Sequence, residues 1–398
     1  MFFNKKLTPL DFLGNKWYYY DVKVCKQEKY MISAENVKIS VVMPIYNASD
    51  YLRPALDSVV HQTLTDIELI CVDDGSTDNS LSIIKEYQQA DERVRILTEN
   101  NAGPSIARNK GLARARGEYV IFLDADDFYD ETLLEKLYNL AEEEKLDIAV
   151  CKFDIYNNRK AKFEDNIKSD HGEIFVEAGV VSKNDYPDVI LSCTTGYIWN
   201  KLFRREFLVE KELVFDEELR VFEDTHFVVN ALSLADRVGK CHERLIHHRV
   251  YTNQPRNKLF KKYYGQVPVV YAKIKEFLRS HGMYIPLSQS FLNLSASRCY
   301  KIYNLLWHDA KREFWNMLHE EYAETLGWTK AEPEYFESQE VCDFVANVLV
   351  YNHKQYVKRE DRGLKVRIKD VGKALKAIQL RKRVKEFFKK KKDDTDSI

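Results

Sequence analysis

The sequence predicts an α/β fold: a mixed, mainly parallel sheet with helices on both faces, plus a mostly helical C-terminal region. Three observations lead to it. Short apolar runs rich in β-branched residues alternate with helical stretches between residues 39 and 153, which is typical of a parallel sheet covered by helices. Three of these runs end in polar clusters, where such sheets bind ligands. After about residue 255 the apolar residues recur mostly at helical spacing.

Each element follows from its local pattern, and the crossovers between parallel strands are expected to be right-handed. The expected strands are Ile39–Met43, Ile67–Val72, Val94–Leu97, Tyr119–Leu123 and Ile148–Phe153, and the expected helices lie near Asp50–His61, Asn79–Gln89, Ser105–Ala115 and Glu131–Glu144. Residues 155–250 mix both patterns. Beyond them, helices are expected around Tyr271–Arg279, Phe291–Trp307 and Val341–Tyr351.

The composition indicates a folded chain of several modules. Of its 398 residues 45% are hydrophobic and 13% aromatic, with only 9 Pro and 14 Gly, so the chain is not largely disordered. Its length suggests two or three modules. The seven cysteines include no Cys-x-x-Cys pair, and neither a signal segment nor an apolar run of about 18 residues occurs. We therefore expect reduced thiols in a cytoplasmic protein without a membrane span.

Charge is distributed unevenly. Residues 354–392 hold 17 basic and 4 acidic residues and carry +13, the last six residues carry −3, and residues 1–353 carry −11. Val371, Ala374, Leu375 and Ile378 recur at helical spacing inside the basic segment. This pattern predicts a basic amphipathic helix on an anionic membrane surface, with a solvated basic tail as the alternative. The acidic remainder argues against nucleic acid as a partner.

Three carboxylates follow the fourth expected strand. Strand alternation would turn Asp124 and Asp126 to the same side, where two carboxylates repel each other unless a cation lies between them. An all-oxygen site of this kind suits Mg²⁺ or Mn²⁺, with open positions for substrate phosphates. The alternative is that Asp127 or Asp130 caps the next helix. We accept that alternative for Asp130 and in part for Asp127.

Further polar clusters follow other expected strands. Asp73-Asp74-Gly75-Ser76 is placed to accept a hydrogen bond from a base or ribose, or forms an Asx-type turn with Asp78 capping the next helix. Gly103-Pro104 opens a helix whose free N–H groups suit a phosphate or carboxylate. Three interpretations of Arg108 on that helix stay open. It could neutralise a diphosphate, pair with one of the aspartates or be an ordinary surface arginine. Two interpretations of His247-His248-Arg249 stay open. These residues could contact the diphosphate or the acceptor, or they could form a partly buried strand end.

Four motifs together resemble the family-2 glycosyltransferases, in that family's order and spacing. They are Val42-Met43-Pro44-Ile45-Tyr46-Asn47, Val72-Asp73-Asp74-Gly75-Ser76-Thr77-Asp78, Gly103-Pro104-Ser105-Ile106-Ala107-Arg108-Asn109 and Phe122-Leu123-Asp124-Ala125-Asp126-Asp127. The resemblance is strong over residues 37–155, weaker to about 250 and absent from the first 36 residues. It implies the Rossmann-like GT-A fold, a nucleotide-sugar donor, with UDP the expected nucleotide, and an inverting reaction.

The resemblance also implies roles for single residues. Pro44 and Tyr46 would line the uridine pocket, and Asp73, with Asp74 as second candidate, would hold the base. Arg108 stands where a nucleotide contact is expected.

The resemblance assigns metal binding to the aspartates of the fourth motif. Asp126 would hold Mn²⁺ or Mg²⁺ on the diphosphate, while Asp124 would reach the ribose and is the second candidate ligand.

The second half of the sequence carries two weaker motifs. Trp199-Asn200-Lys201-Leu202-Phe203 and Phe222-Glu223-Asp224-Thr225-His226-Phe227 resemble those of capsule and lipopolysaccharide members. There the second carboxylate of the Glu-Asp pair is the expected catalytic base, here Asp224; helix-start chemistry is the alternative. No Gln-x-x-Arg-Trp motif occurs, so a non-processive enzyme is favoured.

We therefore expect four parts: an N-terminal extension (1–37), a GT-A glycosyltransferase domain (38–255), a helical C-terminal domain (256–353) and a basic amphipathic tail (354–398). The expected protein is a metal-dependent, inverting hexosyltransferase that acts on a glycan or lipid-linked acceptor in bacterial surface polysaccharide synthesis. It would be cytoplasmic and peripheral on the inner face of the cell membrane.

Two other functions fit parts of the pattern. A nucleotidyltransferase would share the fold but would need a Lys- or Arg-rich glycine loop after the first strand, where Tyr46-Asn47-Ala48-Ser49 stands. A catalytically silent glycan- or membrane-binding protein would be expected to lose a key carboxylate, but Asp124, Asp126 and Asp224 are all present.

Overall fold

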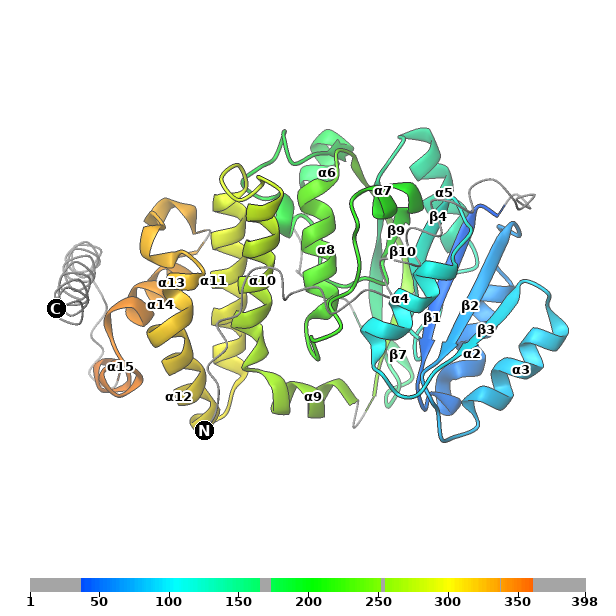
Figure 1. The fold of residues 1–398 in the computed structure, drawn as a ribbon, viewed down its shortest axis with the longest axis horizontal. Coiled ribbons are helices and arrows are strands. Elements are labelled where there is room, and N and C mark those ends of the chain that lie inside the picture. The colour runs from blue at the N-terminus through cyan, green and yellow to red at the C-terminus, as the bar shows by residue number, and fades with distance from the viewer. Residues whose placement is uncertain (1–36, 165–172, 252–254, 337, 361–398) are drawn as a thin grey trace, which may run out of the picture. The chain divides into compact units, whose positions relative to one another are not determined.

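The computed structural model describes residues 37–164, 173–251, 255–336 and 338–360 (Figure 1). The expected N-terminal extension, except for its last residue, and the basic amphipathic helix lie outside the described residues. The described chain divides into two compact units. Unit 1 holds residues 37–164, 198–217 and 237–251, and unit 2 holds the remaining described residues.

Unit 1 is an α/β unit. Its strands are β1 (Ile39–Ile45), β2 (Ile67–Asp73), β3 (Val94–Thr98), β4 (Tyr119–Phe122), β5 (Phe128–Tyr129), β6 (Ile148–Asn157), β7 (Lys162–Glu164), β9 (Lys201–Arg204) and β10 (Val238–Val250). Its helices are α2 (Ser49–Val60), α3 (Ser80–Ala90), α4 (Pro104–Arg114), α5 (Leu133–Glu143) and α7 (Arg205–Glu210).

The strands form one mixed sheet in the order β3-β2-β1-β4-β9-β6-β10-β5, with β7 beside β6. The pairs β1–β2, β2–β3, β1–β4 and β6–β10 are parallel, and β9 is antiparallel to both of its neighbours, β4 and β6. All seven side chains of β2 are buried, including the carboxylates of Glu68 and Asp73.

Helices cover both faces of this sheet. The chain moves outward from β1 to β3 and then returns past β1 to β4, so right-handed crossovers place α4 on the face opposite α2 and α3. In Figure 1, α4 lies in front of the sheet and α2 behind it. The approach of α4 to β1 needs a glycine, because a Cβ atom on Gly111 would lie 2.3 Å from Val42 Cγ1.

Two loops at the carboxyl edge of the sheet are joined by hydrogen bonds. The Asn47 side chain accepts the Thr77 N–H at 2.8 Å, and the Asp78 carboxylate accepts the N–H groups of Ser49 and Ser80, the first residues of α2 and α3. Although partial burial opposes it, these hydrogen bonds lower the pKa of Asp78 to about 2. The expected helix-start role of Asp78 is thus confirmed, and the loop after β1 is fixed against the loop after β2.

Unit 2 is mostly helical. It contains α6 (Glu173–Ala178), β8 (Val180–Val181), α8 (Glu223–Leu234), α9 (Pro255–Tyr263), α10 (Gln266–Ser280), α11 (Ser288–Leu305), α12 (His308–Met317), α13 (Ala323–Thr325), α14 (Gln339–Val350) and α15 (His353–Glu360), with short helical turns at Ile190–Ser192, Leu318–Tyr322, Trp328–Lys330 and Pro333–Tyr335. Residues 225–234 of α8 are all buried.

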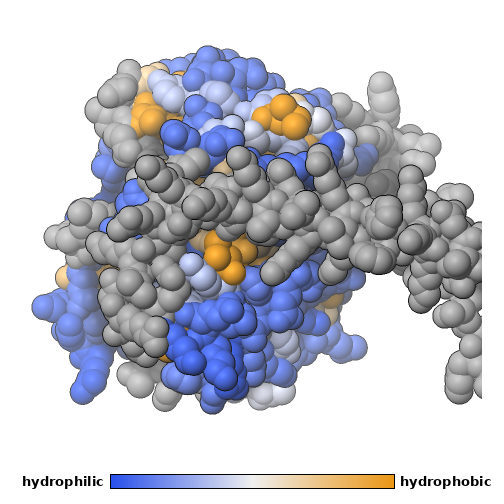
Figure 2. Space-filling view, turned by 90° about the vertical axis from the view of Figure 1, so that its left-hand side faces the viewer, coloured by the Kyte–Doolittle hydropathy of each residue, from blue (hydrophilic) through white to orange (hydrophobic). Residues whose placement is uncertain are grey.

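Among the described helices, none is long and apolar enough to cross a bilayer. The face drawn in Figure 2 is mostly hydrophilic where its residues are coloured, with small separate hydrophobic patches.

The structure confirms the predicted fold class and, among the described residues, the predicted strands and helices between 39 and 351, with shifted ends. The fourth strand ends at Phe122, one residue early, and the last predicted strand extends to Asn157. The mixed pattern of residues 155–250 hid β9 and β10. Four residues are too few to establish a period, and β10 carries charged and His residues along much of its length.

Candidate active site

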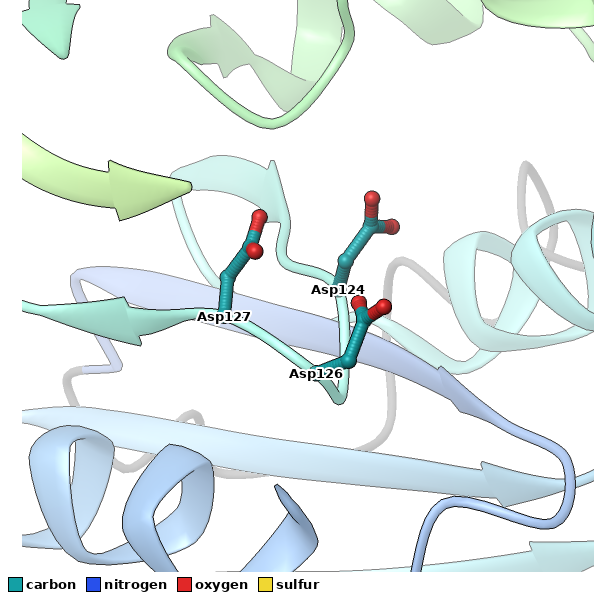
Figure 3. A group of neighbouring side chains, drawn as sticks. All are labelled: Asp124, Asp126 and Asp127. Carbon is teal, nitrogen blue, oxygen red and sulfur yellow. The ribbon is translucent and has the colours of Figure 1, made fainter. Parts of the chain in front are cut away.

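Three carboxylates meet in the loop between β4 and β5, which we call the aspartate loop (residues 124–127). Carboxylate oxygens of Asp124, Asp126 and Asp127 lie within 4.8 Å of one another (Figure 3). β4 ends at Phe122, and residues 125 and 126 form a turn. This turn brings Asp124 and Asp126 together. Our expectation that strand alternation does so is therefore wrong.

The electrostatics of this loop favour a cation. Burial, together with the negative charges of Asp127 and Asp124, raises the pKa of Asp126 to about 7. Burial also raises the pKa of Asp127, although His248 opposes it. A divalent cation would relieve this repulsion and displace the proton. The donor set is oxygen only, which fits Mg²⁺ or Mn²⁺.

The third carboxylate is a structural anchor. Asp127 is 0% exposed and accepts hydrogen bonds from the backbone N–H of Arg249 at 2.8 Å and from His248 Nδ1 at 3.0 Å. The His248 ring in turn stacks on Trp199, with 5.3 Å between the ring centroids. We had accepted in part that Asp127 caps the next helix, α5. That interpretation is wrong, because the Asp127 carboxylate is directed to β10. Asp130 does serve the helix start, because its carboxylate accepts the N–H and hydroxyl of Thr132.

Arg249 and Tyr251 also hold the aspartate loop. The sequence left Arg249 open as a ligand contact or a buried strand end, and the structure buries it at the end of β10. Sequence reasoning missed Tyr251. Arg249 Nε donates to the main-chain oxygen of Asp126 at 2.9 Å, and the Tyr251 hydroxyl donates to Asp126 Oδ2 at 3.1 Å. The run of polar residues that ends β10 was the available signal. Only the topology, which brings β5 beside β10, connects residues separated by more than 120 positions.

Arg108 lies beside the aspartate loop, as one of our alternatives expected. It is 4% exposed, its NH2 group donates to Asp124 Oδ1 at 3.1 Å, and its guanidinium lies 5.4 Å from the centre of the Phe215 ring. The ordinary surface arginine is therefore excluded. The next residue, Asn109, fixes this arrangement through hydrogen bonds with the backbone N–H and carbonyl of Phe215.

The expected nucleotide residues lie on the loops after β1 and β2. Pro44 is half-buried and Tyr46 is 47% exposed, while Asp73 and Asp74 are buried. Asp73 Oδ1 accepts the Ser76 N–H at 3.4 Å, which is the expected Asx-type turn.

Asp74 has a separate task. Its two carboxylate oxygens accept the N–H groups of Ala102 and Gly103, at 2.5 and 2.8 Å, and so fix the segment before α4. Gly75 follows at φ +71°, where a Cβ atom would lie 2.8 Å from the backbone nitrogen of Asn101.

Strand register brings these loops to one edge of the sheet. Ile45 pairs with Asp73, and the backbone N–H of Leu123 donates to the carbonyl of Val42 at 3.0 Å. The ends of β1, β2 and β4 are therefore neighbours, so Pro44, Tyr46, Asp73 and the aspartate loop share one edge. This is the arrangement that the rule for parallel sheets predicts.

Asp224 lies in unit 2, as the second residue of α8. It is partly exposed, and acidic residues in a first helical turn are also favoured by the helix dipole. Phe222, the residue before α8, has φ +60°, a left-handed conformation that costs free energy for a non-glycine residue and occurs often at functional sites. His226, two residues farther, is buried and contacts Asn230.

Comparison with known proteins gives a consistent family match. The model described as Glycosyl transferase family 2 matches residues 40–209. The chain is 33% identical over 216 residues to EpsJ of Bacillus subtilis, an uncharacterized glycosyltransferase, covering 54% of this chain and 62% of EpsJ. It is 32% identical over 253 residues to YibD of Escherichia coli, also an uncharacterized glycosyltransferase, covering 61% of this chain and 72% of YibD.

Two further proteins extend the comparison. The chain is 34% identical over 207 residues to the poly(ribitol-phosphate) beta-glucosyltransferase of Bacillus spizizenii, covering 51% of this chain and 31% of that protein. Among solved structures, residues 1–349 of S. aureus TarS in complex with UDP superpose with a TM-score of 0.64 at 20% identity, covering 83% of this chain and 93% of that chain. The same fragment in complex with UDP-GlcNAc gives the same score.

Proposed function

Because this chain belongs to glycosyltransferase family 2 and has the GT-A fold, we propose that it transfers a sugar from a nucleotide donor to a hydroxyl group of a glycan or lipid-linked acceptor. One observation supports this more than any other. At the carboxyl edge of the sheet, two partly exposed aspartates and a buried arginine form a single cluster of opposite charges. A cation-bound diphosphate is the ligand that such a cluster suits.

The proposed reaction is an inverting displacement. The acceptor oxygen attacks the anomeric carbon from the face opposite the diphosphate, the bond to the diphosphate oxygen breaks, and the acceptor proton passes to Asp224. Mn²⁺ or Mg²⁺ held by Asp126, with Asp124, would offset the charge that develops on the diphosphate. Arg108 would contact the same charge, while Asp73, Pro44 and Tyr46 would bind the nucleoside.

UDP is the proposed nucleotide, and a bacterial surface polysaccharide is the proposed product. Support for UDP comes from TarS, which has the same fold and was solved with UDP and with UDP-GlcNAc. Support for the product comes from the poly(ribitol-phosphate) beta-glucosyltransferase, to which half of this chain is similar. The non-processive mode remains part of the proposal.

We propose to test the transfer with a panel of nucleotide sugars and Mn²⁺, measuring release of the nucleoside diphosphate with and without glycan acceptors. The expected result is release of UDP from one or a few UDP-sugars, at a higher rate with an acceptor. Release of pyrophosphate from a sugar phosphate and a nucleoside triphosphate would instead indicate nucleotidyl transfer. Binding of glycans without turnover of any donor would indicate a catalytically silent protein.

The membrane is a further proposed partner. Residues 354–392 carry +13, and each Lys or Arg near an anionic surface contributes about 1 kcal/mol to binding. Deleting residues 365–398 is therefore expected to move the cytoplasmic protein from the membrane fraction to the supernatant. Fractionation of cell lysates measures this, and unchanged membrane recovery would exclude the tail as the anchor.

A further inference from the structure

We propose that Arg249 is a positioning residue that holds the aspartate loop in the shape that binds the cation, so that β10 sets the Mn²⁺ affinity of a loop far from it in sequence. This inference rests on the proposed function, since that function includes the cation site. It adds a residue that the predicted motifs do not contain.

The first argument is how the loop backbone is fixed. The carbonyl of Asp126 accepts a hydrogen bond from Arg249 Nε at 2.9 Å, and the carbonyl of Asp124 accepts one from the Tyr129 hydroxyl at 2.6 Å. A fixed carbonyl fixes its peptide plane, and the plane sets the direction in which the neighbouring side chains leave the backbone. The two partly exposed carboxylates thus owe their orientation to side chains outside the turn.

The second argument is that Arg249 contacts two successive residues of the loop. Its backbone N–H donates to Asp127 Oδ1 at 2.8 Å while its side chain holds the Asp126 carbonyl. Asp127 is thereby directed to β10. Asp126 takes its place beside Asp124, as Figure 3 shows.

The third argument is that several contacts fix the direction of the guanidinium. It lies 5.0 Å from the centre of the Phe128 ring, 5.3 Å from that of Tyr51 and 5.5 Å from that of Tyr156, and its NH1 group donates to Asn158 Oδ1 at 2.9 Å. Planar guanidinium groups stack on aromatic rings and donate in fixed directions, whereas a lysine ammonium does neither. Lysine at this position would therefore keep the charge and lose the geometry.

The test measures Mn²⁺ affinity directly, by isothermal titration of the full chain without donor. Arg249→Met and Arg249→Lys are both expected to weaken Mn²⁺ binding by about 10- to 100-fold, the usual effect of removing a partner that orients a metal ligand. In the transfer assay both raise the Mn²⁺ concentration needed for half-maximal rate more than they lower kcat at saturating Mn²⁺. Arg53→Met is the matched control, because Arg53 forms an exposed ion pair with Glu86 in the same unit.

The outcomes separate a positioning role from a structural one. If Arg249 only stabilises the fold, its variants lose resistance to urea, but the folded protein binds Mn²⁺ as wild type does, and this overturns the inference. Should Arg249→Met fail to fold, Asn158→Ala removes one hydrogen bond from the guanidinium and is expected to weaken Mn²⁺ binding several-fold. Unchanged affinity in that variant and in Arg249→Lys is equally contrary to the inference.

Asp126→Asn separates this inference from the proposed function. If it abolishes Mn²⁺ binding while the Arg249 variants bind normally, the inference alone fails. If wild type and Asp126→Asn bind Mn²⁺ equally weakly, the cation site of the proposed function fails, and the role of Arg249 fails with it.

Discussion

Asp126→Asn is expected to lower the rate of sugar transfer by about 10³-fold, since a cation that offsets leaving-group charge contributes several kcal/mol to the transition state. The substitution keeps the size of the side chain and removes its charge. Burial, and after it the charges of Asp127 and Asp124, raises the pKa of Asp126, so the negative charge is disfavoured when no cation balances it. The measurement is kcat/KM for the donor at several Mn²⁺ concentrations, where excess Mn²⁺ is expected to restore little activity.

Asp130→Asn is the matched control for this variant. It lies three residues beyond the aspartate loop, and its side chain serves Thr132 at the start of α5. An asparagine oxygen accepts the same hydrogen bonds, so activity close to wild type is expected. If the two variants lose activity equally, the loss reflects the fold of the loop and the cation role of Asp126 is refuted.

Asp224→Asn is expected to lower kcat by about 10²–10⁴-fold, the usual contribution of a general base. Its effect is expected to differ from that of Asp126→Asn because the proposed donor site does not include Asp224. The KM for the donor and the Mn²⁺ affinity are therefore expected to stay within about twofold of wild type. Steady-state kinetics with a genuine acceptor separates the two parameters.

Glu223→Gln provides the comparison for Asp224. Both residues stand in the first turn of α8, so both variants remove one negative charge from the same helix start. Only the Asp224 variant is expected to lose turnover. Full turnover in Asp224→Asn would remove Asp224 from the base role and leave helix-start chemistry as its explanation.

The sequence predicts the α/β half well because local patterns determine it. The strands β1, β2 and β4 are buried and mostly apolar runs between turn residues, and their parallel direction places the aspartates at the carboxyl edge of the sheet. Arg108 could be placed for the same reason, since it stands on the helix that precedes β4.

The partners of the aspartate loop could not be predicted in this way. In the sequence, Asp127 resembles a helix cap because it lies just before α5. Nothing in the local sequence indicates that His248 and the backbone N–H of Arg249 form hydrogen bonds with its carboxylate. That contact depends on β10 pairing with β5 and β6, a non-local arrangement. Clusters of charged residues at strand ends can thus be predicted from the sequence. The distant residues that orient these charged side chains cannot.

The position of β9 has a consequence for synthesis of the chain. During translation β4 emerges early, but its neighbour β9 follows about 80 residues later, and β10 completes the sheet only near residue 250. Until then the nascent chain exposes the bare edge of β4, a template for unwanted pairing with other chains. Fragments cut near residue 165 would keep all four motifs of the donor half and still lack two interior strands, so such fragments are expected to aggregate when expressed alone.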